Sequence, residues 1–190
     1  MQWIWNLDQR LQRVINSDWR SEDADVFFRF VTWFGLDQVI VPFVLVLILA
    51  RGTRRCGWQC LLAYAVAGVG SMVIKRFSSR FRPGYPDDGV FVAPDEEIFL
   101  NSFPSGHTTI AFAVAFSILL TWPGPRRGLV GSIAVAIATL VGLSRVYRGV
   151  HWPTDVIASI ALAFLAALAA TWLFNRGRAE ESQHPSEVPA

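Results

Sequence analysis

A chain of 190 residues is long enough for one domain. Hydrophobic residues make up 53% and charged residues 17%, and long charge-free apolar runs indicate an integral membrane protein rather than a soluble one. The formal net charge of +2 is too small to indicate a nucleic-acid partner, and we expect none.

In the first segment, residues 1–24, the pattern over residues 1–18 predicts an amphipathic helix. Apolar residues recur at helical spacing on one face, and charged residues such as Asp8 and Arg10 lie on other faces: the apolar ones are Ile4, Leu7, Leu11, Val14 and Ile15. The segment is too polar to span a bilayer. It therefore lies in the headgroup region or packs on the other helices.

Residues 26–50 are apolar but are interrupted by Arg29, Gly35 and Asp37. A helix needs about 20 apolar residues to cross a bilayer core, and neither half of this stretch reaches that length. The stretch forms either one tilted span preceded by a short helix or two short elements that meet at Gly35. We favour the first arrangement.

Four clearer spans follow, and none contains Lys, Arg, Asp or Glu: residues 57–74, 107–122, 128–143 and 156–174. The fold class is therefore all-α, a polytopic membrane helix bundle with five transmembrane helices, or six if more of the N-terminal region inserts. We divide the chain into the amphipathic interfacial segment 1–24, a membrane domain at 25–175 and a disordered tail at 176–190.

Three polar clusters lie at the ends of these apolar runs. In chain order they read Lys-x6-Arg-Pro at 75–83, Pro-Ser-Gly-His at 104–107 and Ser-Arg-x5-His-x3-Asp at 144–155. His151 and Asp155 share one face if a helix runs through them. With the arginines beside them, they have the chemistry of a nucleophile, its orienting group and an anion clamp.

The connection at 84–102 is rich in proline and acidic residues, so it cannot lie in hydrocarbon. We expect it to cover the mouth of the site as a solvated lid. Its acids could also be metal ligands, but their spacing fits no metal pattern.

In order and spacing, the three clusters resemble the motifs of the type 2 phosphatidic acid phosphatase family. The resemblance covers residues 57–174, and every defining motif position matches. Within that family, a short chain with little beyond the motif core is most similar to the bacterial undecaprenyl-pyrophosphate phosphatases. The resemblance implies a lipid-phosphate phosphatase that works through a phosphohistidine.

The resemblance and the residue chemistry assign the same catalytic roles. His151 is the predicted nucleophile, and Asp155 is placed to accept a hydrogen bond from the imidazole nitrogen that does not attack. His107 is the predicted general acid, which protonates the leaving oxygen and then activates water. Taken alone, His151 could instead be a structural residue near a helix start at Pro153.

We expect the phosphate to bind to side chains with fixed positive charge and to the free backbone amides at a helix start. The predicted phosphate-binding residues are Lys75, Arg82, Ser105, Gly106 and Arg145. Three other arginines are assigned to the membrane boundary or to anionic headgroups: Arg76, Arg80 and Arg148. We expect no metal and no cofactor, because these cations can neutralise the charge that magnesium neutralises in kinases.

Loop charge predicts the orientation. If the five spans alternate, the arginines at 51–55, 126–127 and 176–178 share one side, which the positive-inside tendency makes cytoplasmic. The three motifs then share the opposite face, periplasmic in a bacterial inner membrane.

The sequence thus predicts a membrane hydrolase of a phospholipid or polyprenyl phosphate. Undecaprenyl pyrophosphate is the favoured substrate, with phosphatidic acid or phosphatidylglycerophosphate as alternatives. Two other functions fit the same clusters: a non-catalytic lipid-phosphate binding or transport protein, and a vanadate-dependent haloperoxidase.

Overall fold

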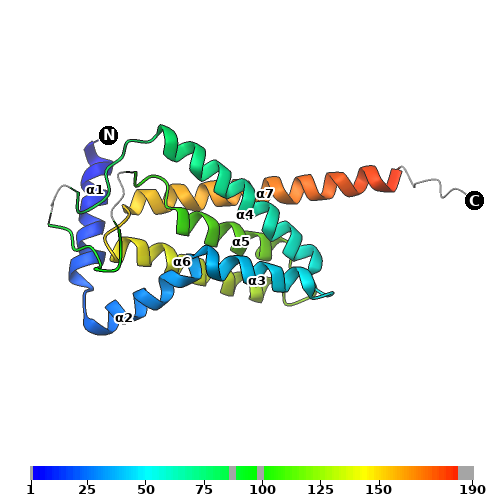
Figure 1. Cartoon of the computed structure of the whole chain (residues 1–190), viewed down its shortest axis with the longest axis horizontal. Coiled ribbons are helices and arrows are strands. Elements are labelled where there is room, and N and C mark those ends of the chain that lie inside the picture. Colours follow the sequence, from blue (N-terminus) through cyan, green and yellow to red (C-terminus); the bar gives the residue numbers. More distant parts are fainter. Residues whose placement is uncertain (1, 86–88, 98–100, 184–190) are drawn as a thin grey trace, which may run out of the picture.

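The computed structural model describes residues 2–85, 89–97 and 101–183. These residues form seven α-helices and two short helical turns, with no strand among them, so the all-α prediction is confirmed for them (Figure 1). The helices are α1 Gln2–Arg13, α2 Glu22–Val31, α3 Asp37–Leu49, α4 Arg54–Phe77, α5 Gly106–Thr121, α6 Arg127–Tyr147 and α7 Pro153–Gln183. A π-helical turn, Val14–Asp18, follows α1, and a 3-10 turn, Thr32–Gly35, follows α2.

Helix α5 lies at the centre of the bundle and packs against α4, α6 and α7. Small side chains make up much of this core, among them Ala63, Ala67, Ala113, Ala163, Ala167 and Ala170. In lipid, helices are held together by close van der Waals contact, which small residues allow. The alanines therefore explain how α5 can have three close neighbours.

Three described helices are long and apolar enough to cross a membrane: α4, α6 and the first part of α7, Pro153–Arg176. The stretch Glu22–Gly35 passes the same test only together with α3, as a pair bent by 52°. Helix α5 is apolar but has 16 residues. By length and composition, the described helices thus give three candidate spans, or four with the bent pair, and the predicted count of five stays a prediction.

The region 26–50 differs from the arrangement that we favoured. It forms two short elements that meet at Gly35, rather than one tilted span after a short helix. Helix α2 has its own start signal, because the Ser21 side chain accepts a hydrogen bond from Ala24 N at 3.2 Å. The bend places the turn at Thr32–Gly35 against α5 and α6.

Helix α1 lies across the end of the bundle where α4 ends and α5 and α7 begin (Figure 1). It packs on the protein by its polar side together with the π-helical turn after it, since Asp8 and Gln12 of α1 and Asn16 of the turn are buried, while Leu7 and Leu11 are exposed. The alternative in which this segment packs on other elements is therefore observed. Its position at the membrane interface stays a prediction.

The C-terminal helix continues further than expected. We predicted a disordered tail from residue 176, whereas α7 stays helical to Gln183 and projects beyond the other helices in Figure 1. The remainder of the predicted tail, 184–190, lies outside the described residues.

Candidate active site

The three motifs meet at one end of the bundle. Lys75 lies in the last turn of α4, Arg145 in the last turn of α6, His107 at the start of α5, and His151 in the turn before α7. The charges of the six motif residues act on one another, which places them in one cluster: Lys75, Arg82, His107, Arg145, His151 and Asp155. The structure thus brings together residues from the ends of α4, α5, α6 and α7 and from the connections between these helices.

His151 is buried, with 2% of its surface exposed. Burial lowers its pKa from 6.5 to about 4; Asp155 acts to raise the pKa, and the charges of Arg145 and Arg82 lower it. The imidazole is therefore neutral at pH 7, as a nucleophile must be.

Asp155 lies beside His151 without the predicted hydrogen bond. The distance from His151 Nδ1 to Asp155 Oδ2 is 3.6 Å, and Nδ1 has no hydrogen-bond partner among the described residues. Asp155 Oδ2 instead accepts from the Trp152 backbone amide at 2.9 Å. The carboxylate thus contributes negative charge beside the imidazole and stabilises the turn that carries it.

Arg80, which we assigned from the sequence to the membrane boundary or to anionic headgroups, lies at the site. Its Nη1 donates to Asp155 Oδ1 and to Thr154 Oγ1, each at 2.7 Å. Its Nη2 donates to Asp8 Oδ2 in α1. Arg80 therefore connects two carboxylates from distant parts of the chain.

Asp8 was also missed as a site residue. Its side chain is fully buried, and Thr154 donates to it twice, from the backbone amide at 2.9 Å and from the hydroxyl at 2.5 Å. A signal was present in the sequence, because Asp8, Gln12 and Asn16 recur every four residues on one helix face. The sequence pattern does not show which residues that polar face contacts.

Arg145 and Arg148 share an acidic partner from the connection before α5. Both guanidinium ends of Arg145 donate to the Glu96 carboxylate at 2.8 Å, and Arg148 donates to Glu96 and to Asp95 at 2.7 and 2.6 Å. Burial alone would raise the pKa of Glu96, but the hydrogen bonds and charges of Arg145 and Arg148 lower it to about 2. Two acids of the expected solvated lid, Asp95 and Glu96, are therefore bonded to arginines of α6 and the turn after it.

Arg145 also donates to Thr32 Oγ1 at 2.6 Å. Glu96 presents two oxygens to the planar fork of Arg145, as a phosphate would. To bind a phosphate, Arg145 must therefore use the N–H groups of its guanidinium that Glu96 and Thr32 do not occupy, or Glu96 must be displaced.

The start of α5 is anchored through Ser105. Its backbone amide donates to Ser159 Oγ at 2.8 Å, and its own Oγ accepts from Thr108 at 2.9 Å. This amide is therefore unavailable to a phosphate. The space beside Gly106 is open, because an added Cβ there would meet nothing within 4 Å. Of the two predicted phosphate-binding positions at this helix start, Ser105 and Gly106, only the backbone at Gly106 is therefore accessible to a phosphate.

Two glycines permit close approach of backbone to the site. A Cβ at Gly35 would lie 3.0 Å from His107 Cβ and 2.7 Å from Val141 Cγ1. Gly149 has a φ of +76°, and a Cβ there would lie 2.0 Å from Phe91 O. Each position therefore requires glycine, at the 3-10 turn and at the turn that carries His151.

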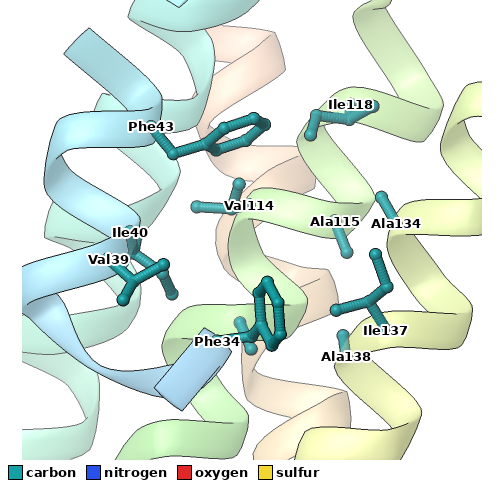
Figure 2. Close-up of a pocket in the computed structure, with 11 residues that line it drawn as sticks. Phe34, Val39, Ile40, Phe43, Val114, Ala115, Ile118, Ala134, Ile137 and Ala138 are labelled. Atoms are coloured by element: carbon teal, nitrogen blue, oxygen red, sulfur yellow. The ribbon is translucent and has the colours of Figure 1, made fainter. Parts of the chain in front are cut away.

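An apolar groove of about 220 Å³ lies between α3, α5 and α6 (Figure 2). Ala111 follows His107 by one helical turn, and Ala138 precedes Arg145 by two turns, so the groove lies on the helix faces that carry the site. Its lining is Phe34, then Val39, Ile40 and Phe43 of α3, Ala111, Val114, Ala115 and Ile118 of α5, and Ala134, Ile137 and Ala138 of α6.

The described residues contain no group of three or more His, Cys, Asp or Glu side chains arranged to bind a metal ion. Cys56 and Cys60 are buried thiols at the far end of α4, with their sulfurs 4.0 Å apart. They lie within the core, as packing residues do.

Comparison with known proteins gives concordant matches. Residues 57–179 match the PAP2 superfamily. The undecaprenyl-diphosphatase of Sulfolobus acidocaldarius is 34% identical over 130 residues, which are 68% of this chain and 60% of that protein. Phosphatidylglycerophosphatase B of Bacillus subtilis is 32% identical over 144 residues, 71% of this chain and 68% of that protein.

Two solved structures have a similar fold. The crystal structure of Aquifex aeolicus LpxE has a TM-score of 0.76 and 28% identity, and the match covers 87% of this chain and 94% of that one. A PAP2-type phosphatidylglycerolphosphate phosphatase from Bacillus subtilis has a TM-score of 0.76 and 25% identity, with coverage of 93% and 88%.

Proposed function

Because the chain belongs to the PAP2 superfamily, as its three motifs predicted, we propose that it is an integral membrane lipid phosphatase that works through a phosphohistidine on His151. The observation that carries the proposal is the cluster itself. Two histidines and three cations from separate helices and connections meet at one end of an apolar helix bundle. Such a cluster can bind a phosphate at the polar edge of a membrane.

In the first step, Nε2 of neutral His151 attacks phosphorus, and the bond from phosphorus to the leaving oxygen breaks. Protonated His107 donates its proton to that oxygen and becomes neutral. In the second step, a water molecule attacks phosphorus, the bond from phosphorus to His151 Nε2 breaks, and His107 takes the proton from the water as inorganic phosphate leaves. Both histidines thereby return to their starting states.

The cations stabilise the charge on the transferring group. Lys75, Arg82 and Arg145 surround the histidines and would contact its equatorial oxygens. Asp155, 3.6 Å from His151 Nδ1, offsets the positive charge that the imidazole gains when it is phosphorylated. We propose that the reaction needs no added metal, because this arrangement supplies the positive charge.

The substrate class follows from the groove in Figure 2. Its lining is apolar and includes Ala111 and Ala138, which follow His107 by one helical turn and precede Arg145 by two turns, so it suits the chain of a lipid whose phosphate binds in the cluster. Undecaprenyl pyrophosphate is the favoured substrate, and phosphatidic acid and phosphatidylglycerophosphate are alternatives. The names of the two relatives support this range, since one is an undecaprenyl-diphosphatase and the other a phosphatidylglycerophosphatase.

The site is proposed to face the periplasm of a bacterial inner membrane. The arginines near Arg54 and Arg126 lie at the ends of α4 and α6 that are remote from the cluster. By the positive-inside tendency, those ends are cytoplasmic.

The test is release of inorganic phosphate by the protein purified in detergent, with undecaprenyl pyrophosphate and phosphatidic acid as substrates and a chelator present. We expect release by the wild type and its loss, by at least about 1,000-fold, in His151→Ala. No release from either lipid by folded wild-type protein would contradict the proposal and favour a binding or transport function. Release that requires an added divalent metal would contradict metal independence.

A further inference from the structure

Helix α1 is attached to the site by a row of buried polar side chains. Gln12 donates to Val146 O at 3.0 Å, and Asn16 donates to Tyr147 O at 2.7 Å. Asp8 accepts from the Thr154 amide and hydroxyl. All three thus bind the segment 146–154, which carries His151.

Asp8 differs from the other two because it is charged and its partners include Arg80. Arg80 donates through Nη2 to Asp8 and through Nη1 to Asp155, so one planar guanidinium joins the two carboxylates. Both carboxylates have no exposed side-chain surface, whereas the Arg80 side chain is 25% exposed. A buried charge pair in this geometry fixes the orientation of each member.

Asp8 also affects the charge that Asp155 presents to His151. Without Asp8, the positive charge of Arg80 would act on Asp155 alone, and Asp155 would stabilise a positively charged imidazole less well. With Asp8 in place, Arg80 is shared by two anions, and Asp155 keeps more of its negative charge for His151.

We propose that Asp8 is a positioning residue for the reaction: through Arg80, it orients Asp155 and preserves its charge beside His151. This inference rests on the proposed function. It makes the N-terminal helix part of the catalytic apparatus, although Asp8 itself touches neither the phosphate nor the nucleophile.

The experiment measures kcat and KM for phosphate release in Asp8→Asn, which keeps the shape and the acceptor for the Thr154 amide but removes the charge. We expect kcat to fall between about tenfold and 100-fold with KM unchanged. Asp18→Asn, the same change at an exposed position of the same segment, should leave kcat unchanged. In an Arg80→Gln background, Asp8→Asn should cause no further loss, because the route through Arg80 is already broken.

Three results would overturn the inference. One is an unchanged kcat in folded Asp8→Asn. Another is an additive loss in the double variant. The third is an equal loss of kcat in Gln12→Ala, because that variant weakens the attachment of α1 without touching Arg80.

If Asp8→Asn is not recovered folded, Arg80→Gln tests the same connection, and an unchanged kcat in it also overturns the inference. Wild type and His151→Ala are measured alongside. An inactive wild type would contradict the proposed function, whereas an active wild type with an unaffected Asp8→Asn contradicts only the role of Asp8.

Discussion

Around His151, three guanidinium groups meet carboxylates from other segments. Arg80 pairs with Asp155 and Asp8, and Arg145 and Arg148 pair with Glu96. Such pairs are costly to bury, but each one here is hydrogen-bonded and shared, which offsets the loss of hydration. The result is a site with strong local charge in which the nucleophile remains neutral.

The first prediction at this scale concerns the titration of His151. With a pKa near 4, its imidazole should stay mostly neutral as the pH is lowered to 5, whereas an exposed histidine is half protonated at about pH 6.5. The unfolded chain takes up this proton near pH 6.5 and the folded protein only near pH 4. This group therefore makes the folded state less stable as pH falls between those values.

The measurement is NMR of protein labelled at histidine, in detergent micelles. The sequence contains three histidines, so His107→Gln and His184→Gln variants identify the signal of His151. A midpoint near 6.5 for that signal would show that the imidazole is more hydrated than its burial indicates.

At the scale of elements, each helix end contributes one part of the site, and the bend after α2 contributes another. The 3-10 turn Thr32–Gly35 reaches His107 through Gly35 and Arg145 through Thr32. It also provides Phe34, which lines the groove (Figure 2). The bend therefore links the phosphate cluster to the proposed position of the lipid chain.

A second prediction follows from the groove. A lipid chain gains no hydrophobic free energy when it moves from bilayer to groove, because both are apolar, so the groove acts by orienting the substrate. Ala134→Leu narrows the groove and should lower kcat/KM for undecaprenyl pyrophosphate by about tenfold or more. The same variant should leave hydrolysis of para-nitrophenyl phosphate, which has no lipid chain, unchanged.

The matched control is Ala136→Leu, two residues along α6 at an exposed position. It adds the same volume outside the groove and should have little effect on either substrate. Equal losses for both substrates in Ala134→Leu would mean that the groove does not receive the substrate chain.

At the scale of the whole molecule, polarity is divided between the two ends of the bundle. The end with α1 and the connection before α5 carries the paired charges of the site, and the other end carries arginines such as Arg54 and Arg126 at helix starts. The exposed surface of the helices between them is apolar, with many large side chains such as Leu45, Met72, Ile133 and Leu165. This arrangement matches a bilayer with the site at one surface.

The orientation can be tested by labelling single cysteines, with Cys56 and Cys60 replaced by alanine. Asp18→Cys marks the end with the site, and Arg126→Cys marks the other end. In intact bacterial cells, a membrane-impermeant maleimide should label the Asp18→Cys protein and should reach the Arg126→Cys protein only after permeabilisation. The reverse pattern would place the site in the cytoplasm.

The sequence by itself determined the helical class, the family and the six motif residues that the structure brings together. Hydrophobic runs and motif spacing are local properties, so the positions of α4 to α7 and of Lys75, His107, Arg145 and His151 could be predicted. It also predicted a hydrogen bond between Asp155 and His151, which the structure does not contain. The spacing of the two residues was right, but the other partners of Asp155 could not be read from it.

Only the tertiary structure decided which polar groups pair. Asp8 lies 72 positions from Arg80 and 146 from Thr154, and Glu96 lies 49 from Arg145. The sequence shows that a charge must find a partner when it is buried, but which partner it meets depends on how the segments pack. For that reason Arg80 and Arg148 resembled residues of a membrane boundary in the sequence and are part of the site in the folded protein.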